Sequence, residues 1–264
     1  MDNATNNVII EKRDAEGWIT FNDPAKHNAM SLDMWAAVEP ALKAFENDDE
    51  IRVVVLTGAG EKAFVSGANI SQFDKLRSSV DAVAEYERVA EGAQNAIYNY
   101  SKPTVARIKG YCIGGGLNLA LCCDIRIACD NSSFSIPAGK MGLGYRLTAI
   151  RNLVTATGPA NALDIFLSAR RVAAQEAQRM GLIQHLATED TFEQTVREHL
   201  DRIAANAPLT LRVGKHMIRR FQDVPSEIDM EKMRDMVLSC FASEDYQEGK
   251  QAFAQKRAPV FKGR

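Results

Sequence analysis

Residues 109–124 read KGYCIGGGLNLALCCD, and this stretch decides the fold. A predicted strand at residues 104–108 leads into it, three glycines follow at 114–116, and an apolar run typical of a helix ends it. Glycine carries no side chain, so the backbone can approach a ligand closely. The first N–H groups of a helix lack backbone partners and carry a partial positive charge. The stretch therefore predicts either a tight strand-to-helix turn or a site for an oxygen that becomes anionic during a reaction.

The composition is that of an ordinary globular protein. The chain has 264 residues, 46% of them hydrophobic and 25% charged, with a formal net charge of -2. A net charge this small gives no reason to expect binding to nucleic acid or to an anionic membrane. No uncharged apolar run approaches the roughly 18 residues of a membrane span, and the polar N-terminus does not resemble a signal peptide. We therefore expect a cytoplasmic protein.

The cysteines predict neither a zinc site nor a disulfide framework. They are Cys112, Cys122, Cys123, Cys129 and Cys240. Most lie in apolar segments, and no pair has the C-x-x-C spacing of a metal or redox motif. We expect buried thiols that act as small hydrophobic side chains, and no bound metal.

Strands and helices alternate over the first two thirds of the chain. Alternating residues 8–13 and 17–21 flank a turn and predict a hairpin, and Ser31 is expected to cap a helix that contains Pro40. Further strands are expected at residues 51–57, 125–128, 132–137 and 183–186. Further helices are expected at residues 81–100, 147–157, 160–168, 173–180 and 244–257.

The alternation stops near residue 190, and the pattern from residue 191 onward is helical. This change predicts an α/β core at residues 1–190 and a C-terminal helical region at residues 191–264. The helical region has few long apolar stripes of its own. We therefore expect it to pack on the core or on a neighbouring subunit.

Several stretches together resemble the crotonase superfamily, the enoyl-CoA hydratase/isomerase family. They occur in the family's order and spacing and span nearly the whole chain. They are KHNAM at 26–30, VVVLTG at 53–58, KAFVSGANI at 62–70, KPTVA at 102–106, residues 110–124, and FAQKRAPVF at 253–261. The resemblance implies a crotonase-like α/β spiral of ββα units with a C-terminal helical trimerisation region. It also implies a homotrimer or a hexamer, and an acyl-CoA substrate that brings coenzyme A with it, without a tightly bound cofactor.

The resemblance also assigns an oxyanion hole. In the family it consists of two backbone N–H groups, which match Ala68 and Gly115, in agreement with the helix start predicted above. Such donors stabilise a thioester enolate, and removing one typically costs about 3 kcal/mol of barrier in other enzymes.

Contacts to coenzyme A or the acyl group are implied for a larger set of residues. They are Lys26, His27, Asn28, Ala29, Ser66, Ala68, Asn69, Ile70, Ile113, Gly114, Gly115, Pro137, Phe253 and Lys256. Phe253 and Lys256 are expected to come from a neighbouring subunit. Without the resemblance, Lys26 and Lys256 would be taken as solvated surface lysines, and Ile70 and Phe253 as core residues.

Three positions depart from the family pattern. A family hydratase uses two glutamates to hold water and move its proton, and these positions are Asn118 and Ala138 here. Neither side chain titrates near neutral pH, so neither can act as a general acid or base. Standard hydration therefore loses both of its groups, and the isomerase reaction loses the glutamate that it needs. The usual family aspartate after Ser-Gly-Ala is Asn69 in this chain.

An oxyanion hole alone suits a reaction whose first step needs no base, such as decarboxylation of a malonyl-type thioester. The loop at residues 134–145 resembles the corresponding loop of methylmalonyl-CoA decarboxylase, a family member, which ends in a tyrosine near the thioester. Tyr145 is therefore a candidate acid that protonates carbon, or else a packing tyrosine. That decarboxylase has a histidine where this chain has Ala68. Lys140 and Arg146 flank the loop and either meet a substrate carboxylate or carry surface charge.

Three functions thus stay open from the sequence. The first is an acyl-CoA lyase, with decarboxylation preferred over hydration. The second is a family member that binds acyl-CoA without turning it over, and the third is another α/β protein with a glycine turn. The histidines lack a convincing acidic or cysteine partner and are expected to be structural or surface residues, with His27 alone near coenzyme A.

Overall fold

The computed structural model describes residues 7–69, 80–206, 208–221, 238, 241–257 and 259. Ile70 and Cys240, both named above, lie outside the described residues.

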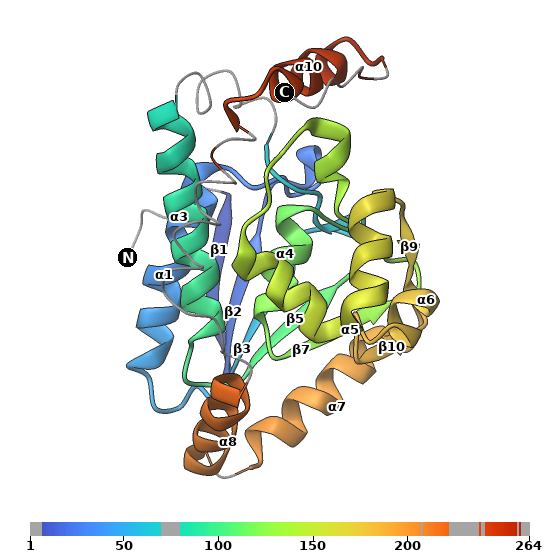
Figure 1. The fold of residues 1–264 in the computed structure, drawn as a ribbon. Coiled ribbons are helices and arrows are strands. Elements are labelled where there is room, and N and C mark those ends of the chain that lie inside the picture. The colour runs from blue at the N-terminus through green and yellow to red at the C-terminus, as the bar shows by residue number, and fades with distance from the viewer. Residues whose placement is uncertain are drawn as a thin grey trace.

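A six-stranded sheet forms the centre of the molecule, in the order β1-β2-β3-β5-β7-β10 (Figure 1). Its strands are β1 (Val8–Arg13), β2 (Glu16–Phe21), β3 (Val53–Gly58), β5 (Thr104–Ile108), β7 (Ile125–Cys129) and β10 (His185–Ala187). The hairpin β1-β2 is antiparallel, and every later pairing in this sheet is parallel. Parallel strands need crossover connections, and here these connections contain helices.

A second, smaller sheet brings the glycine stretch next to other loops. Its order is β4-β6-β8-β9, with β4 (Ala63–Val65), β6 (Tyr111–Ile113), β8 (Ser133–Ser135) and β9 (Val172–Ala173). The sequence analysis did not predict β4, β6 or β9. Each is only two or three residues long and is held by pairing with strands far away in the chain, so it has little signal of its own.

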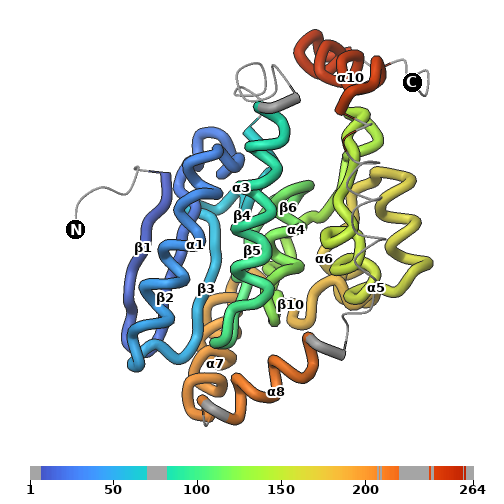
Figure 2. The backbone as a smooth tube through the Cα atoms, turned by 60° about the vertical axis from the view of Figure 1, so that its left-hand side comes forward, coloured from blue at the N-terminus to red at the C-terminus, as the bar shows by residue number. Residues whose placement is uncertain are grey.

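Helices cover both faces of the main sheet. They are α1 (Leu32–Glu46), α3 (Val80–Tyr98), α4 (Gly115–Cys122), α5 (Leu147–Ser168), α6 (Ala174–Arg179), α7 (Phe192–Ala204), α8 (Pro208–Phe221) and α10 (Glu244–Ala254), with 3-10 helices η1 (Pro24–Lys26) and η3 (Pro137–Met141). Figure 2 shows α1 and α3 side by side, with α10 at one end of the molecule and α7 and α8 at the other. None of the helices within the described residues is long and apolar enough to cross a membrane.

The predicted element types are confirmed, with shifts at their ends. Ser31 caps α1 by accepting from the Met34 N–H at 3.2 Å, as expected. The two helices expected at 147–157 and 160–168 form one element, α5, which is interrupted at Gly158 (φ 74°, ψ 162°). Gly158 precedes Pro159, and a residue before proline avoids the helical region. The strand expected at 183–186 starts two residues later, and the last helix ends at Ala254 rather than at 257.

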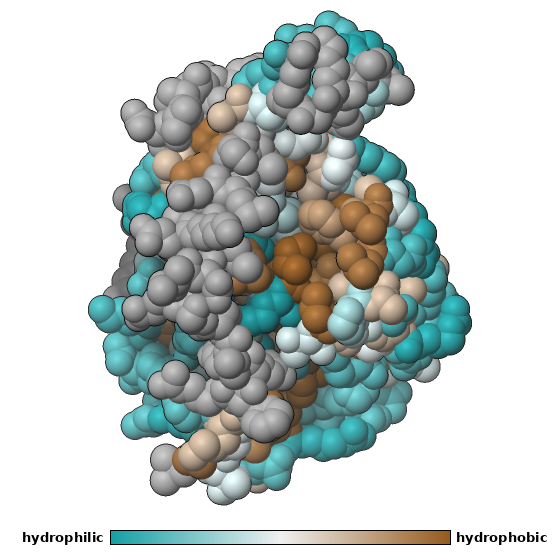
Figure 3. Space-filling view, viewed as in Figure 1, coloured by the Kyte–Doolittle hydropathy of each residue, from teal (hydrophilic) through white to brown (hydrophobic). Residues whose placement is uncertain are grey.

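Two apolar clusters enclose the main sheet. On one face, Trp35, Phe64 and Phe134 pack with α4, which is buried from Gly116 to Cys122. On the other face, Val55 and its neighbours pack against the apolar stripe of α7. Burying each such large side chain stabilises the fold by roughly 1.5–3 kcal/mol. Apolar side chains also gather on the surface over α5, where Leu163 and Leu167 are exposed (Figure 3).

Candidate active site

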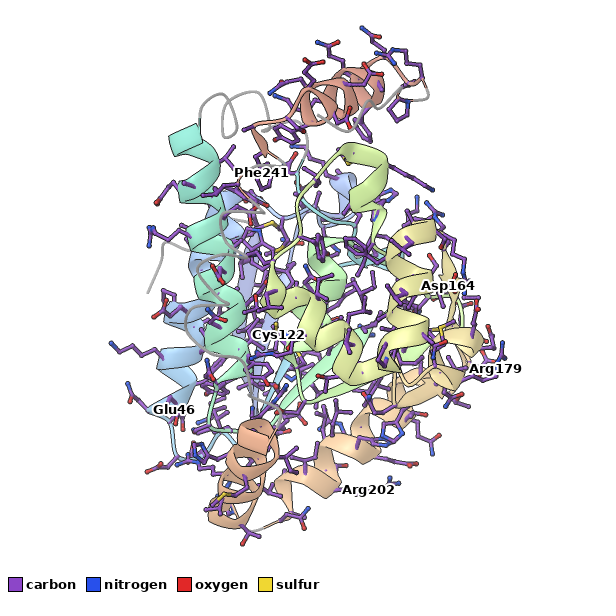
Figure 4. The ribbon with its side chains drawn as sticks, viewed as in Figure 1. Glu46, Cys122, Asp164, Arg179, Arg202 and Phe241 are labelled. Atoms are coloured by element: carbon purple, nitrogen blue, oxygen red, sulfur yellow. The ribbon has the colours of Figure 1, made fainter. Side chains whose placement is uncertain are left out.

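A cavity of about 610 Å³ lies beside the start of α4. Its walls come from the loop at residues 66–68, residues 113–115, one face of α3, the segment 137–146, and α10 with the residues that flank it. Phe241 stands at the end near α10, edge-on to Tyr246, with the two ring centres 5.2 Å apart (Figure 4). A mostly apolar cavity of this size with a few polar groups is the usual form of a small-molecule site.

The backbone at Ala68 is held in a defined direction by Met30. The Met30 N–H donates to Gly67 O at 2.8 Å, and the Asn69 N–H donates to Met30 O at 2.9 Å. In this parallel bridge, Met30 makes its backbone hydrogen bonds with Gly67 and Asn69, the residues on either side of Ala68. The N–H of Ala68 itself therefore points away from Met30, and Ala68 lines the cavity.

Gly115 is the first residue of α4 and also lines the cavity. The first helical bond of α4 runs from the Asn118 N–H to Gly114 O at 3.1 Å, so the Gly115 N–H has no partner within the helix. Gly114 has φ +54°, which favours glycine. A Cβ on Gly116 would lie 2.3 Å from the Val65 carbonyl oxygen, so α4 can approach β4 only with glycine here. The structure thus brings the Ala68 and Gly115 backbones to one cavity.

Asn118 and Tyr145 meet beside this helix start. The Tyr145 hydroxyl donates to Gly114 O at 3.3 Å. Burial raises the pKa of the Tyr145 hydroxyl above its ordinary value of 10.0, and this effect outweighs the Asn118 hydrogen bond and the Arg146 charge, which both lower it. Asn118 is 5% exposed, and within the described part of the chain its Oδ1 has no hydrogen-bond partner. A buried acceptor without a partner is costly, so the Asn118 Oδ1 is suited to accept a hydrogen bond from a ligand group or water.

Ala138 lies buried in η3 at the same cavity. Asn118 and Ala138, the two positions that the resemblance assigns to glutamates, therefore supply no carboxylate to the cavity. One carboxylate does line the cavity, however, and the sequence analysis missed it: Glu87 of α3. A signal was present in the sequence, because Glu87, Ala90 and Gln94 are spaced to lie on one face of a helix. That face lines the cavity.

Arg146 lies in the cavity wall rather than on the surface, which corrects the surface alternative for this residue. Its side chain is 16% exposed, and its Nε lies 3.3 Å from Glu87 Oε2. Its two Nη atoms donate to the Glu87 backbone oxygen at 3.1 Å and to Gln94 Oε1 at 3.3 Å. Lys140 is exposed at the cavity wall.

The residues expected to contact coenzyme A fall into two groups. Those that line the cavity are Ala29, Ser66, Ala68, Ile113, Gly114, Gly115, Pro137 and Phe253. Phe253 lines this cavity from α10 of the same chain, and its supply by a neighbouring subunit stays a prediction. The others are outside the described lining: Lys26, His27, Asn28, Asn69 and Lys256.

The Asn28 side chain holds the loop before α1 in place. It is fully buried, accepts from the Asp23 N–H at 3.0 Å, and donates to Ala59 O and Ala63 O at 2.9 and 2.7 Å. His27 stacks on Tyr111 with the ring centres 5.8 Å apart, at the foot of the same loop. These contacts give the loop a fixed shape next to the cavity.

The described cysteines are buried, as expected. Burial raises the pKa of Cys112 and Cys123, and it raises the pKa of Cys122 to about 11. Figure 4 shows Cys122 in the interior of the molecule. Within the described ranges no group of three or more metal-ligating side chains is found.

Comparisons with known proteins agree with this geometry. A model of the family described as Enoyl-CoA hydratase/isomerase matches residues 11–264. Short-chain-enoyl-CoA hydratase of Clostridium acetobutylicum is 30% identical over 252 residues, which are 96% of this chain and 96% of that protein. Carnitinyl-CoA dehydratase of Salmonella typhi is 33% identical over 251 residues, 93% of this chain and 94% of that protein. The solved structure of methylmalonyl-CoA decarboxylase with 2-nitronate-propionyl-CoA has a TM-score of 0.89 at 28% identity, covering 99% of this chain and 100% of that one.

Proposed function

The chain belongs to the enoyl-CoA hydratase/isomerase family, and we propose that within this family it is a lyase that decarboxylates a malonyl-type thioester. The expected crotonase-like α/β fold is confirmed by the structural similarity to family members. Acyl-CoA processing is the activity that the family shares, and decarboxylation is the reaction that we propose within it.

The proposed reaction needs no base in its first step. The bond from Cα to the carboxylate breaks, carbon dioxide leaves, and the electron pair forms an enolate. The N–H groups of Ala68 and Gly115 donate to the thioester oxygen as its negative charge develops. Such donors act mainly on the transition state, so they accelerate the step and do not merely bind the substrate. Tyr145 then gives its hydroxyl proton to Cα.

The placement of Tyr145 is the observation that carries this proposal. Its hydroxyl lies 3.3 Å from the carbonyl oxygen of Gly114, the residue before the oxyanion glycine. The two positions at which a hydratase of this family keeps glutamates hold Asn118 and Ala138 instead. The similarity to methylmalonyl-CoA decarboxylase, a protein named for this reaction, supports the same conclusion.

Hydration or dehydration is the second candidate, because the sequence relatives are named for such reactions. It requires a carboxylate to activate water. Among the described residues of the cavity wall, only Glu87 is acidic.

We also propose that the protein works as a homotrimer or a hexamer. The observation behind this is the outer face of α8, which we call the α8 apolar face. It consists of Val213, Met217 and Ile218, each at least 59% exposed in the single chain. A contiguous exposed apolar face of this kind marks a protein contact more often than free surface.

The reaction is tested by a mass-spectrometric screen against CoA thioesters. The panel contains crotonyl, malonyl, methylmalonyl, 3-hydroxyacyl and aromatic acyl forms. We expect loss of carbon dioxide from a malonyl-type member, and a fall of about 100-fold or more for Tyr145→Phe, because a positioned acid contributes roughly that much. Tyr111→Phe is the matched control, since Tyr111 stacks on His27 outside the cavity lining.

Other outcomes overturn the proposal. Water addition to crotonyl-CoA without decarboxylation would establish the hydratase. Binding of thioesters without turnover would favour the acyl-CoA-binding protein. Unchanged decarboxylation in Tyr145→Phe would remove the tyrosine from the mechanism.

A further inference from the structure

The cavity contains an acidic side chain that decarboxylation does not use. Glu87 is 21% exposed at its side chain and faces the cavity from α3. It is the sole carboxylate among the described residues that line this cavity. Carboxylates are seldom placed in a mostly apolar wall unless a partner holds them there.

The partner is Arg146, which fixes the Glu87 carboxylate by contacts on both its side chain and its backbone. The guanidinium lies 3.3 Å from Oε2 and donates to the backbone oxygen of the same residue at 3.1 Å. Gln94, about two turns further along α3, accepts from the same guanidinium at 3.3 Å. The carboxylate is therefore held in one position on a regular helix, which is the arrangement that a catalytic base needs.

The pair is next to the groups that would surround the acyl chain. Arg146 follows Tyr145 in the chain, and the charges of Arg146 and Glu87 both act on the Tyr145 hydroxyl. Asn118, with its buried Oδ1 free of partners among the described residues, lies on the same cavity. Glu87, Tyr145, Ala68 and Gly115 thus line one cavity.

We propose that Glu87 is a general base that removes a proton from Cα of an acyl thioester held by the Ala68 and Gly115 N–H groups. The inference rests on the same oxyanion hole as the proposed function, but it adds an activity on thioesters that carry no second carboxylate. The C–H electron pair becomes the enolate, and the proton passes to the Glu87 carboxylate. Its return to Cα exchanges hydrogen with solvent, and its return to Cγ of an unsaturated chain moves the double bond. Neither route consumes a further reactant.

Deuterium exchange into propionyl-CoA tests this activity directly, because this thioester cannot lose carbon dioxide. The full-length protein is incubated with it in D2O, and the mass of the acyl group is followed over time. We expect the wild-type protein to introduce deuterium at Cα. Glu87→Gln should reduce the rate by about 100-fold or more, since a positioned base typically contributes that factor.

Glu85→Gln is the matched control. Glu85 lies on the same helix, is exposed, and pairs with Arg88 at 2.7 Å. Its replacement removes an equal charge from α3 and should leave the exchange rate unchanged. Glu87→Asp keeps the charge but withdraws the carboxylate, and it should slow exchange by about tenfold or more, because small misplacements of a catalytic group are costly. Binding of propionyl-CoA should persist in all three variants, which a merely structural role of Glu87 would not predict.

Two results would overturn the inference: no exchange by the wild-type protein, or wild-type exchange rates in Glu87→Gln. If Glu87→Gln does not fold, a wild-type rate in Glu87→Asp has the same meaning. The proposed function is judged separately, by loss of carbon dioxide from malonyl-type thioesters. Exchange that depends on Glu87, without any decarboxylation, would support this inference and overturn the decarboxylase proposal. Decarboxylation without exchange would support the decarboxylase proposal and overturn this inference.

Discussion

At the scale of single residues, the adjacent glycines Gly115 and Gly116 at the start of α4 have different structural roles. A Cβ on Gly115 would meet nothing closer than Trp35, at an ordinary 3.5 Å, whereas one on Gly116 would lie 2.3 Å from the Val65 carbonyl oxygen. The close approach of α4 to β4 therefore depends on Gly116. In the proposed oxyanion hole, Gly115 contributes its N–H group, which any residue except proline would supply in that conformation.

The protonation of Tyr145 sets the expected pH dependence of the proposed decarboxylation. Burial raises the pKa of this hydroxyl above 10.0, so the acid form persists at every pH below that value. An acid catalyst loses activity when it is deprotonated, and the loss attributable to Tyr145 should therefore begin only above pH 10. The measurement is the pH profile of kcat between neutrality and the alkaline limit of stability. A falling limb below pH 9 or so that disappears in Tyr145→Phe would contradict this assignment.

Single residues also show how far the sequence can predict a site. Ala68, Gly115, Asn118, Ala138 and Tyr145 belong to contiguous motifs, and all of them line the cavity. The pairing of Glu87 with Arg146 joins residues far apart in the chain across two elements. Nothing in the local pattern of either residue indicates that contact, because it arises only when α3 packs beside the loop before α5.

At the scale of elements, α10 closes the cavity against η3. A Cβ on Gly249 would lie 2.4 Å from the Met141 carbonyl oxygen, so the two backbones approach more closely than any other residue would allow. The same helix brings Ala252 and Phe253 to the cavity. We infer that α10 contributes to substrate binding rather than to the central core.

A serine caps the N-terminus of both α1, a helix of the core, and α10, the helix at the cavity. Ser31 accepts from the Met34 N–H at 3.2 Å, and Ser243 accepts from the Tyr246 N–H at 3.1 Å. Loss of either cap should cost about 1 kcal/mol of helix stability. Ser31→Ala should lower the free energy of unfolding of the whole protein. Ser243→Ala should instead raise KM for the thioester with little change in kcat, because α10 lines the cavity.

Urea unfolding and steady-state kinetics of the two variants test this difference. Equal losses of global stability in both, with KM unchanged in Ser243→Ala, would show that α10 belongs to the core after all.

The elements themselves were predictable in proportion to their length. Helices such as α1 and α3 carry many apolar residues at helical spacing and a recognisable cap or boundary, so they were found within a few residues. The strands β4, β6 and β9 were missed because partners distant in the chain decide whether so short a segment is extended. The missed strand β6 matters most, since it sets the direction in which the chain enters α4.

At the scale of the whole molecule, Asp124 links the α/β sheet to the C-terminal helices. Its carboxylate lies 2.7 Å from Lys215 Nζ and 2.9 Å from an Arg219 Nη, both on α8. It also accepts from the Thr104 N–H at 2.8 Å, which ties it to β5. The two cations are only 11% and 17% exposed at their side chains. This cluster therefore fixes α8, and with it the α8 apolar face, against the sheet. The division of the chain at residue 190 stays a prediction.

Replacing Asp124 should loosen this link and weaken the assembly. Asp124→Asn leaves the Lys215 and Arg219 charges in a largely dry site without their carboxylate, and breaking such a pair from one side costs about 3 kcal/mol. Asp164→Asn is the matched control, because it removes a carboxylate that pairs with Arg170 on the surface, where such a pair contributes at most about 1 kcal/mol. Urea unfolding measures the stability, and light scattering measures the assembly mass. We expect Asp124→Asn to lose both stability and trimer or hexamer mass. An Asp124→Asn protein as stable as Asp164→Asn would show that α8 is held by its apolar contacts alone.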